Sequence, residues 1–261
     1  MNERIQVSKP DFSGKTVIVT GGTKGLGYGI ASVFAQWGAN VVITSRTEHE
    51  VLACAEEFHQ EGFSCLGVAA DSARQADIDR VIHQAVEKFG KIDILINNAG
   101  IGGKTAPIFQ QEEADFMRVI ETNLKGVYLF GRAVAMQMAK QGTGGRIINM
   151  SSAAGMIGGK NMAPYCASKA GVISITKTMA NEWARYQILV NAVCPGYVIT
   201  PLNEDVFADP AVRTKMEKRN AVRRLGSIEE IAVPVAMLAS DCFSYMTGAA
   251  IVIDGGETIG G

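Results

Sequence analysis

Short runs of apolar, mostly β-branched residues alternate along the chain with longer stretches in which apolar residues recur every three or four positions. The short runs are almost continuously apolar, as strands covered on both faces of a parallel sheet must be. The longer stretches have the length and spacing of amphipathic helices. The predicted strands are residues 16–20, 40–44, 65–69, 92–96, 146–150, 189–193 and 250–253. The main predicted helices are residues 26–37, 74–89, 114–140 and 165–185.

This alternation predicts a Rossmann-type α/β fold, in which a doubly wound, seven-stranded parallel sheet carries helices on both faces. No repeat, low-complexity segment or block of charge divides the chain, so residues 1–261 are expected to form a single domain. Residues 195–227 break the alternation with a charged stretch that predicts no strand. Such a long connection is typical of a lid over a functional site.

The charge balance and the cysteines narrow the possible partners and locations. With 25 Lys and Arg against 26 Asp and Glu, the chain lacks the basic excess typical of nucleic-acid-binding proteins. Its longest apolar run is far shorter than the roughly 20 residues of a membrane-spanning helix, so no membrane partner is expected. Five cysteines without CxxC spacing and a polar N-terminus predict a reduced, cytoplasmic protein. The three histidines lack ligand-spaced partners, and we expect no metal site.

The first predicted strand ends in a glycine-rich turn that leads directly into a helix. Glycines in the segment TGGTKGLG, residues 20–27, allow a sharp turn and a close approach of the backbone to a pyrophosphate. The helix N-terminus adds free N–H donors and a favourable dipole. A plain glycine-rich turn is the alternative interpretation of this spacing. The predicted phosphate-binding residues are Gly21, Thr23, Lys24, Gly25, Leu26 and Gly27.

The end of the second predicted strand indicates which nucleotide binds. An acidic residue there would bind the ribose hydroxyls and repel a 2′-phosphate, but the sequence has Ser45 followed by Arg46. Arginine offers a planar set of donors for phosphate, and Lys24 can add a second positive charge. Although both cations could be solvated surface residues, their positions favour NADP(H) as the cofactor.

A second group of residues has the chemistry of carbonyl reduction. Tyr165 and Lys169 are one helical turn apart and therefore share a helix face. Ser152 lies just past a predicted strand, and Asn123 lies in the preceding long helix. Taken singly, each of these residues has an ordinary structural explanation, such as a strand-end cap or a locally satisfied polar side chain.

The order of these features resembles the short-chain dehydrogenase/reductase family over residues 12–256. The matching positions are TGGTKGLG at 20–27, Asp71, NNAG at 97–100, Asn123, Ser152, Tyr165, Lys169, PGYVIT at 195–200 and DGG at 254–256. The resemblance implies an oxidoreductase with Asn123, Ser152, Tyr165 and Lys169 as catalytic residues. The cofactor contacts that it implies are Asp71, Asn98, Ala99, Gly100, Tyr165, Lys169, Pro195, Gly196, Val198 and Thr200.

Chemistry gives each catalytic candidate a role. Hydride transfer to a carbonyl needs a proton donor, and a nearby ammonium would lower the pKa of Tyr165 from about 10 toward the working pH. Tyr165 is then the general acid in reduction and the base in oxidation, while Ser152 donates a hydrogen bond to the substrate oxygen. The resemblance implies that Lys169 also holds the nicotinamide ribose and that Asn123 holds a water connecting Lys169 to solvent.

The sequence says least about the substrate. Residues 211–224, AVRTKMEKRNAVRR, carry six basic residues and one acid, which favours a small anionic ketone if some of the cations face the site. They could equally form a solvated helix face. Residues 179–184, MANEWA, resemble the aldonate dehydrogenase branch of the family, such as gluconate 5-dehydrogenase and 2-deoxygluconate 3-dehydrogenase. We expect an NADP(H)-dependent enzyme that interconverts a keto sugar or keto-aldonate and its secondary alcohol.

Other functions fit the same residues. A 3-oxoacyl-[acyl-carrier-protein] reductase docks its acidic carrier on arginines, for which the matching positions are Thr143 and Tyr186, with Arg185 beside them. A reductase of steroids or other alicyclic ketones is excluded by no residue. A non-catalytic NADP-binding regulator would be free to lose Tyr165 or Lys169, and both are present. The family resemblance also implies a homotetramer built on helices 114–140 and 165–185 and on the C-terminal strand.

Overall fold

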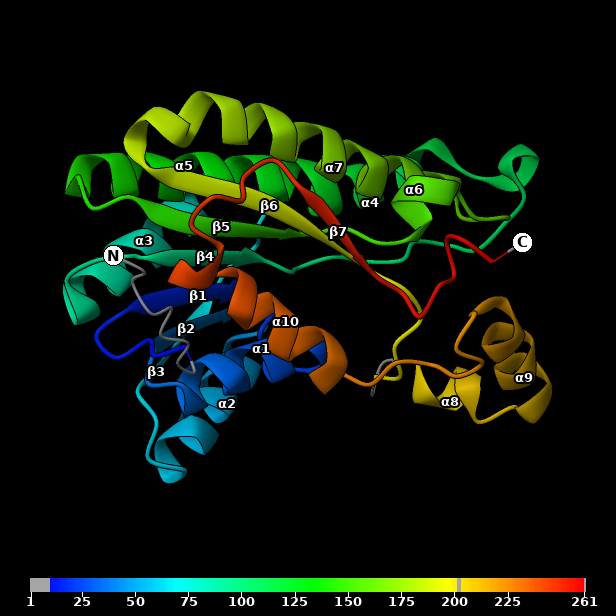
Figure 1. The fold of residues 1–261 in the computed structure, drawn as a ribbon, viewed down its shortest axis with the longest axis horizontal. Helices are drawn as coiled ribbons and strands as arrows, with labels where there is room; N and C mark the ends of the chain where they lie inside the picture. Colours follow the sequence, from blue (N-terminus) through cyan, green and yellow to red (C-terminus); the bar gives the residue numbers. More distant parts are fainter. Residues whose placement is uncertain (1–9, 201–202, 261) are drawn as a thin grey trace, which may run out of the picture.

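The continuously apolar runs form the middle layer of the structure, because each of their two faces meets a separate helical layer. In β1 (Thr16–Thr20), Val17 and Val19 pack into one core and Ile18 into the other, and all three are fully buried. A strand with one solvent-exposed face would instead alternate apolar and polar residues. The computed structural model describes residues 10–200 and 203–260, and Figure 1 shows its layers.

The strand order confirms the predicted doubly wound, Rossmann-type fold. After β1 come β2 (Asn40–Ser45), β3 (Cys65–Ala69), β4 (Ile94–Asn97), β5 (Gly145–Met150), β6 (Ile188–Pro195) and β7 (Ala250–Ile253). All pairs are parallel, and the order in the sheet is β3-β2-β1-β4-β5-β6-β7. The order reverses between β1 and β4, so the loops leaving these two strands diverge and open a crevice at their carboxyl ends.

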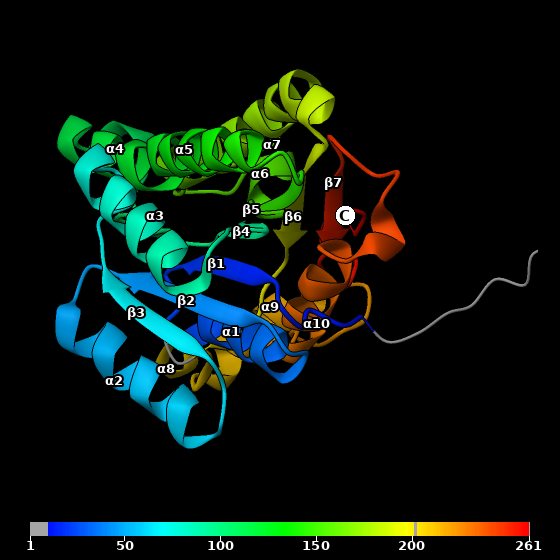
Figure 2. The same ribbon diagram turned by 90° about the vertical axis from the view of Figure 1, so that its left-hand side faces the viewer.

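Helices cover both faces of the sheet. They are α1 (Gly25–Gln36), α2 (Glu48–Gln60), α3 (Gln75–Phe89), α4 (Glu113–Ile120), α5 (Gly126–Gln141), α6 (Ala154–Ile157), α7 (Ala163–Trp183), α8 (Glu204–Phe207), α9 (Pro210–Arg219) and α10 (Glu229–Leu238). Helices α1, α2 and α10 pack on one face, and α3, α5 and α7 pack on the other (Figure 2). Within residues 10–200 and 203–260, no helix is both long and apolar enough to span a membrane.

Two predicted segments differ in detail from the structure. The helix predicted over 114–140 is α4 and α5 joined by a π-helical turn, Glu121–Lys125, through which the helical backbone continues. Asn123 lies in this turn, and such turns are frequent at functional sites. The predicted lid contains α8 and α9, and a bridge between Val198 and Gly226 brings its two ends together. In Figure 1, α8 and α9 lie beyond the carboxyl ends of the strands.

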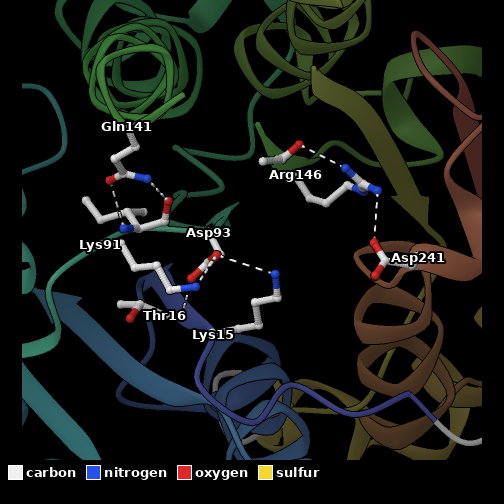
Figure 3. Close-up of polar contacts among 9 residues, drawn as sticks. Lys15, Thr16, Lys91, Asp93, Gln141, Arg146 and Asp241 are labelled. Atoms are coloured by element: carbon white, nitrogen blue, oxygen red, sulfur yellow. Dashed lines mark hydrogen bonds and ion pairs between the residues drawn. The ribbon is translucent and has the colours of Figure 1, made fainter. Parts of the chain in front are cut away.

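Polar side chains form hydrogen bonds at the amino-terminal ends of the strands, on the side of the sheet opposite to the crevice (Figure 3). Asp93, directly before β4, accepts hydrogen bonds from the backbone N–H of Thr16 at 2.9 Å and from Lys91 at 3.0 Å. The side-chain amide of Gln141, at the end of α5, bonds both backbone groups of Ile92. These contacts fix β1 beside β4 at one edge and leave the carboxyl ends of the strands to form the crevice.

Candidate active site

Two glycines of the segment between β1 and α1, Gly21 and Gly27, cannot be replaced by a larger residue without strain. A Cβ on Gly27 would overlap the carbonyl oxygen of Gly21, and Gly21 has a φ of +65°, which favours glycine. No side chain caps the N-terminus of the 12-residue helix α1, so its first N–H groups are open to a ligand. Such a terminus binds phosphate oxygens through its N–H groups and its dipole. The residues present therefore fit the pyrophosphate of a dinucleotide.

Hydrogen bonds join the end of β4 to this turn. The hydroxyl of Thr20 accepts from the backbone N–H groups of Asn98 and Ala99 at 2.9 and 3.0 Å. The side-chain amide of Asn98 donates to the carbonyls of Thr20 and Gly21 at 3.0 and 3.1 Å. Asn98 and Ala99, two of the predicted cofactor contacts, thus brace the turn directly. A turn that is fixed before a ligand arrives lowers the ordering cost of binding.

A cavity of about 840 Å³ opens at the carboxyl ends of β4, β5 and β6 and reaches the lid helix α9. Its volume lies within the range of small-molecule sites, about 300–1,000 Å³. The predicted site residues that line it are Leu26, Asn98, Gly100, Ser152, Tyr165, Lys169, Pro195, Gly196 and Val198. The predicted residues that do not line it are Gly21, Thr23, Lys24, Gly25, Gly27, Ser45, Arg46, Asp71, Ala99, Asn123 and Thr200.

Tyr165 and Lys169 both face this cavity from α7, one helical turn apart. The ammonium of Lys169 lies 5.7 Å from the centroid of the Tyr165 ring and donates a 2.7 Å hydrogen bond to the carbonyl of Met150. Lys169 is only 5% exposed, and this burial lowers its pKa to about 8. A neutral carbonyl at the end of β5, and not a carboxylate, therefore accepts the hydrogen bond of the ammonium.

The pKa of the Tyr165 phenol is shifted in the direction opposite to the one expected from the sequence. Burial raises its pKa, and a hydrogen bond with Ser152 opposes that rise only in part. No hydrogen bond joins Lys169 to the Tyr165 hydroxyl in the described part of the chain. The phenol therefore holds its proton at neutral pH, which is the form that a proton donor needs in ketone reduction.

Asn123 is fully buried in the π-helical turn and ties the loop after β4 to α7. Its amide donates to the carbonyl of Ile101 at 2.9 Å and to the hydroxyl of Ser168 at 3.1 Å, and its oxygen accepts from the Ile101 N–H at 2.8 Å. A Cβ on Gly100 would lie 3.3 Å from this oxygen and 3.6 Å from Nζ of Lys169. Sequence reasoning missed Ser168, although it directly precedes Lys169.

The residues predicted to select NADP(H) lie at the end of β2 and the start of α1. Arg46 is exposed and forms no ion pair with any residue in the described ranges. The hydroxyl of Ser45 accepts from the backbone N–H of Thr47 at 3.3 Å. Nζ of Lys24 lies 3.7 Å from a carboxylate oxygen of Glu50, on α2, a partner that the sequence did not indicate. Arg46 is thus available to a phosphate, whereas Lys24 is shared with Glu50.

Asp71, Thr200 and Val198 are three further predicted cofactor contacts. The carboxylate of Asp71 accepts from the backbone N–H of Ala73 at 2.9 Å, a turn contact typical of Asp. A Cβ on Gly25 would lie 3.6 Å from Thr200, so the PGYVIT segment lies against the phosphate turn. Val198 lines the cavity, and its backbone N–H donates to no group in the described residues. That N–H remains available to a ligand.

The structure separates the basic residues of the lid into two groups. Lys215 and Arg219 line the cavity together with Ser152 and Tyr165. Lys160 and Glu257 line it as well, and sequence reasoning missed both, because they lie in loops where no periodicity fixes the direction of a side chain. The other lid arginines bond within the lid or to α10: Arg213 with Glu217, Arg224 with Glu230, and Arg223 with the carbonyl of Lys218.

Known proteins resemble this chain over nearly its whole length. Residues 21–258 match the family model described as enoyl-(acyl carrier protein) reductase. The chain is 38% identical to L-rhamnose 1-dehydrogenase (NAD(P)(+)) of Sphingomonas sp. (strain SKA58), over 94% of this chain and 96% of that protein. It is also 38% identical to 3beta-hydroxysteroid dehydrogenase 1 of Eggerthella lenta, over 95% of each chain. A solved structure provisionally assigned as a gluconate dehydrogenase of Agrobacterium tumefaciens has a TM-score of 0.90 at 33% identity, covering 95% of this chain and 98% of that one.

The buried ammonium of Lys169 makes stability depend on pH in a defined direction. Below pH 8 the lysine is charged in both the folded and the unfolded state, and burying that charge costs free energy. Between pH 8 and 10.5 the folded protein releases the proton while the unfolded chain keeps it, so the free energy of unfolding rises with pH. We expect the stability difference between the parent protein and Lys169→Met to change by up to about 1.4 kcal/mol per pH unit. Denaturant unfolding of both proteins measures this change, and a pH-independent difference would contradict it.

Proposed function

The chain belongs to the short-chain dehydrogenase/reductase family, and we propose that it interconverts a keto sugar or keto-aldonate and its secondary alcohol with NADP(H). As a member of this family it is an oxidoreductase that acts on alcohols or ketones with a nicotinamide cofactor. The observation that carries the substrate proposal is the position of Lys215 and Arg219. Both line the same cavity as Ser152 and Tyr165.

In this proposal, four side chains divide the proton chemistry. A bound nicotinamide supplies the hydride in reduction and accepts it in oxidation. The hydroxyl of Tyr165 gives its proton to the carbonyl oxygen in reduction and takes it back in oxidation, while the hydroxyl of Ser152 holds the same oxygen. Lys169 provides positive charge beside the ring and, with its lowered pKa, can return a proton toward Tyr165. Asn123 positions α7 through Ser168, and its oxygen keeps an acceptor site near Lys169 for a water.

The preference for NADP(H) rests on charge at the end of β2. Arg46 carries a planar set of donors and has no acidic partner in the described chain, so a 2′-phosphate would meet a cation that is free to bind it. Ser45 occupies the position at which an acid would repel that phosphate. Glu50 acts in the opposite direction, because it lies 3.7 Å from Lys24 and neutralises part of the positive charge. We infer a preference for NADP(H) that Glu50 moderates.

Two alternative substrates fit the structure less well. Similarity to a 3beta-hydroxysteroid dehydrogenase favours an alicyclic ketone. Against it, the cavity contains the buried carboxylate of Glu257 and the ammonium of Lys215, which an apolar ligand would desolvate without compensation. A carrier-bound 3-oxoacyl group would require docking near Thr143 and Tyr186. These positions precede β5 and β6 and therefore lie at the sheet edge opposite to the cavity of the same chain.

A homotetramer is the assembly that we propose, in a reduced, cytoplasmic setting. Large apolar side chains are exposed on α5 and just after α7, including Met136 at 66% and Tyr128 and Tyr186 at 42% each. Exposed apolar patches of this kind are typical of subunit contacts. The location is inferred from the five cysteines, all of which are unpaired.

Removal of the Tyr165 hydroxyl tests the enzymatic function. We expect Tyr165→Phe to lower kcat for ketone reduction by about 10² to 10⁴-fold, because the general acid is lost. NADPH affinity should change little, since the ring remains in place. The absorbance decrease during NADPH oxidation measures kcat, and fluorescence titration with NADPH measures the affinity. If the variant consumed NADPH as fast as the parent protein, the proposed mechanism would be wrong.

Two substitutions with opposite effects test the cofactor preference. Arg46→Ala should weaken NADPH binding by about tenfold or more and leave NADH binding nearly unchanged, because a charge-assisted phosphate contact is lost. Glu50→Gln should strengthen NADPH binding by about two- to fivefold, since an exposed ion pair with Lys24 is worth up to about 1 kcal/mol. Titration of both cofactors against each protein measures these changes. Equal affinities of the parent protein for NADPH and NADH would contradict the preference.

A panel of ketones at low and high salt tests the substrate class. The panel contains 5-ketogluconate, a neutral keto sugar, a 3-oxoacyl thioester and a steroid ketone. We expect 5-ketogluconate to have the highest kcat/KM and to lose its advantage over the neutral sugar as salt screens the lid cations. A steroid or thioester that exceeded it by more than tenfold, or a keto-acid rate insensitive to salt, would argue against the proposal.

Light scattering at several concentrations tests the assembly. We expect a particle with the mass of four 27.8 kDa chains across the accessible range. Met136→Glu should shift the population toward smaller species, because it places a charge on the exposed apolar face of α5. Leu52→Glu, at an exposed position of α2 away from the helices proposed for the contact, serves as a matched control. A fully active, stable monomer would rule out the tetramer.

A further inference from the structure

Glu257, in the segment after β7, occupies an unusual position for an acid. Its side chain is only 8% exposed, yet it lines the cavity that contains Ser152 and Tyr165. Backbone contacts hold this segment beside the end of α9: the N–H of Val222 donates to the carbonyl of Gly255 at 3.1 Å. Main-chain contacts therefore place this segment in the wall of the cavity, and the low exposure of the Glu257 side chain restricts where its carboxylate can move.

The carboxylate of Glu257 has unused capacity to accept hydrogen bonds. Its one ion pair in the described chain is with Arg219 at 3.7 Å, which is longer than a hydrogen bond. An ionised carboxylate offers about four acceptor sites, and a buried one without donors is costly. Burial accordingly raises the pKa of Glu257. Hydroxyl groups of a ligand in the cavity would supply the missing donors.

Cations lie next to this acid in the same cavity. Lys215 and Arg219 come from α9, and the guanidinium of Arg219 lies 5.9 Å from the centroid of the Tyr197 ring. The side chain of Arg219 is 45% exposed, so it can turn from Glu257 toward an incoming carboxylate at little cost. The cavity wall therefore presents a fixed acceptor beside adaptable positive charge.

We propose that Glu257, together with Lys215 and Arg219, forms a two-part subsite for a hydroxy carboxylate. A ligand hydroxyl donates to Glu257, and the ligand carboxylate pairs with the two cations. This subsite rests on the proposed function, since it names the recognition chemistry of a keto-aldonate. It also explains why one cavity carries both signs of charge.

Three ligands without a reactive ketone test the subsite independently of turnover. Gluconate carries hydroxyls and a carboxylate, glucitol carries only hydroxyls, and hexanoate carries only a carboxylate. Their dissociation constants are measured by ligand-observed NMR on the protein loaded with NADPH, because the reduced cofactor cannot oxidise the hydroxyl groups of gluconate or glucitol. The variants are Glu257→Gln and Arg219→Gln, with Arg213→Gln as a matched control, because Arg213 pairs with Glu217 and does not line the cavity.

The two variants are expected to weaken the binding of different ligands. Arg219→Gln should weaken gluconate and hexanoate by about tenfold and change glucitol by less than twofold, because only the charge-assisted contact is lost. Glu257→Gln should weaken gluconate and glucitol but strengthen hexanoate, since Arg219 loses its internal counter-ion. Arg213→Gln should leave all three constants within twofold. Ratios between ligands are taken within one preparation, so the fraction of folded protein cancels.

Equal changes in the dissociation constants of all three ligands would contradict the proposed subsite. If either variant shifted all three ligands by the same factor, the Arg219–Glu257 pair would be a structural latch of the lid. If neither variant changed any constant, the three residues would not contact the ligands. Turnover of 5-ketogluconate is measured separately. If the two variants affect different ligands but 5-ketogluconate is not reduced, the subsite is supported and the proposed substrate is rejected. If 5-ketogluconate is reduced but each variant shifts all three ligands equally, the substrate is supported and the subsite is rejected.

Discussion

The buried ammonium of Lys169 is the constraint that determines the arrangement of the end of the cavity that contains Tyr165 and Ser152, which we call the reaction end. A charge at this depth is costly unless neighbouring dipoles replace the water that it has lost. The carbonyl of Met150 supplies one such dipole, and the carbonyl of Lys169 itself accepts a 2.8 Å hydrogen bond from the hydroxyl of Ser151. Both bonds join the end of β5 to α7, and together they fix the position of α7 along the strands. This position brings Tyr165 beside Ser152.

Polar contacts deeper in the sheet reinforce the same alignment. Asn149 on β5 donates to the hydroxyl of Thr176 on α7 at 2.9 Å and accepts from the amide of Asn97 on β4 at 2.9 Å. All three side chains are buried, so a shift of α7 would leave at least one of them without its partner. Buried networks that are fully satisfied in this way favour a single arrangement. The reaction end is therefore rigid, whereas exposed ion pairs hold much of the lid.

Local periodicity explains how much of this could be predicted from the sequence. The strands follow from continuous apolar runs, and the pairing of Tyr165 with Lys169 follows from a spacing that any helix places on one face. The π-helical turn at Asn123 was not predicted, because one inserted residue hardly changes the apolar pattern of the surrounding helix. Glu50 and Glu257 were missed for a different reason. Each meets its cation across loops of unpredictable path, and only tertiary packing decides which charges become neighbours.

The lid shows why counting charges is a poor guide to substrate preference. Six cations stand in one short stretch of sequence, but exposed pairs such as Arg213 with Glu217 contribute little beyond local support for the helix. A charge acts strongly only where water is excluded, and among the charged side chains on the lid side of this cavity that applies most to Glu257. The field that a substrate meets is thus set by one fixed acid and by cations that can reorient around it. Such a wall suits a ligand that carries hydroxyl groups as well as negative charge, because each part of that ligand satisfies a group which the protein alone leaves incompletely paired.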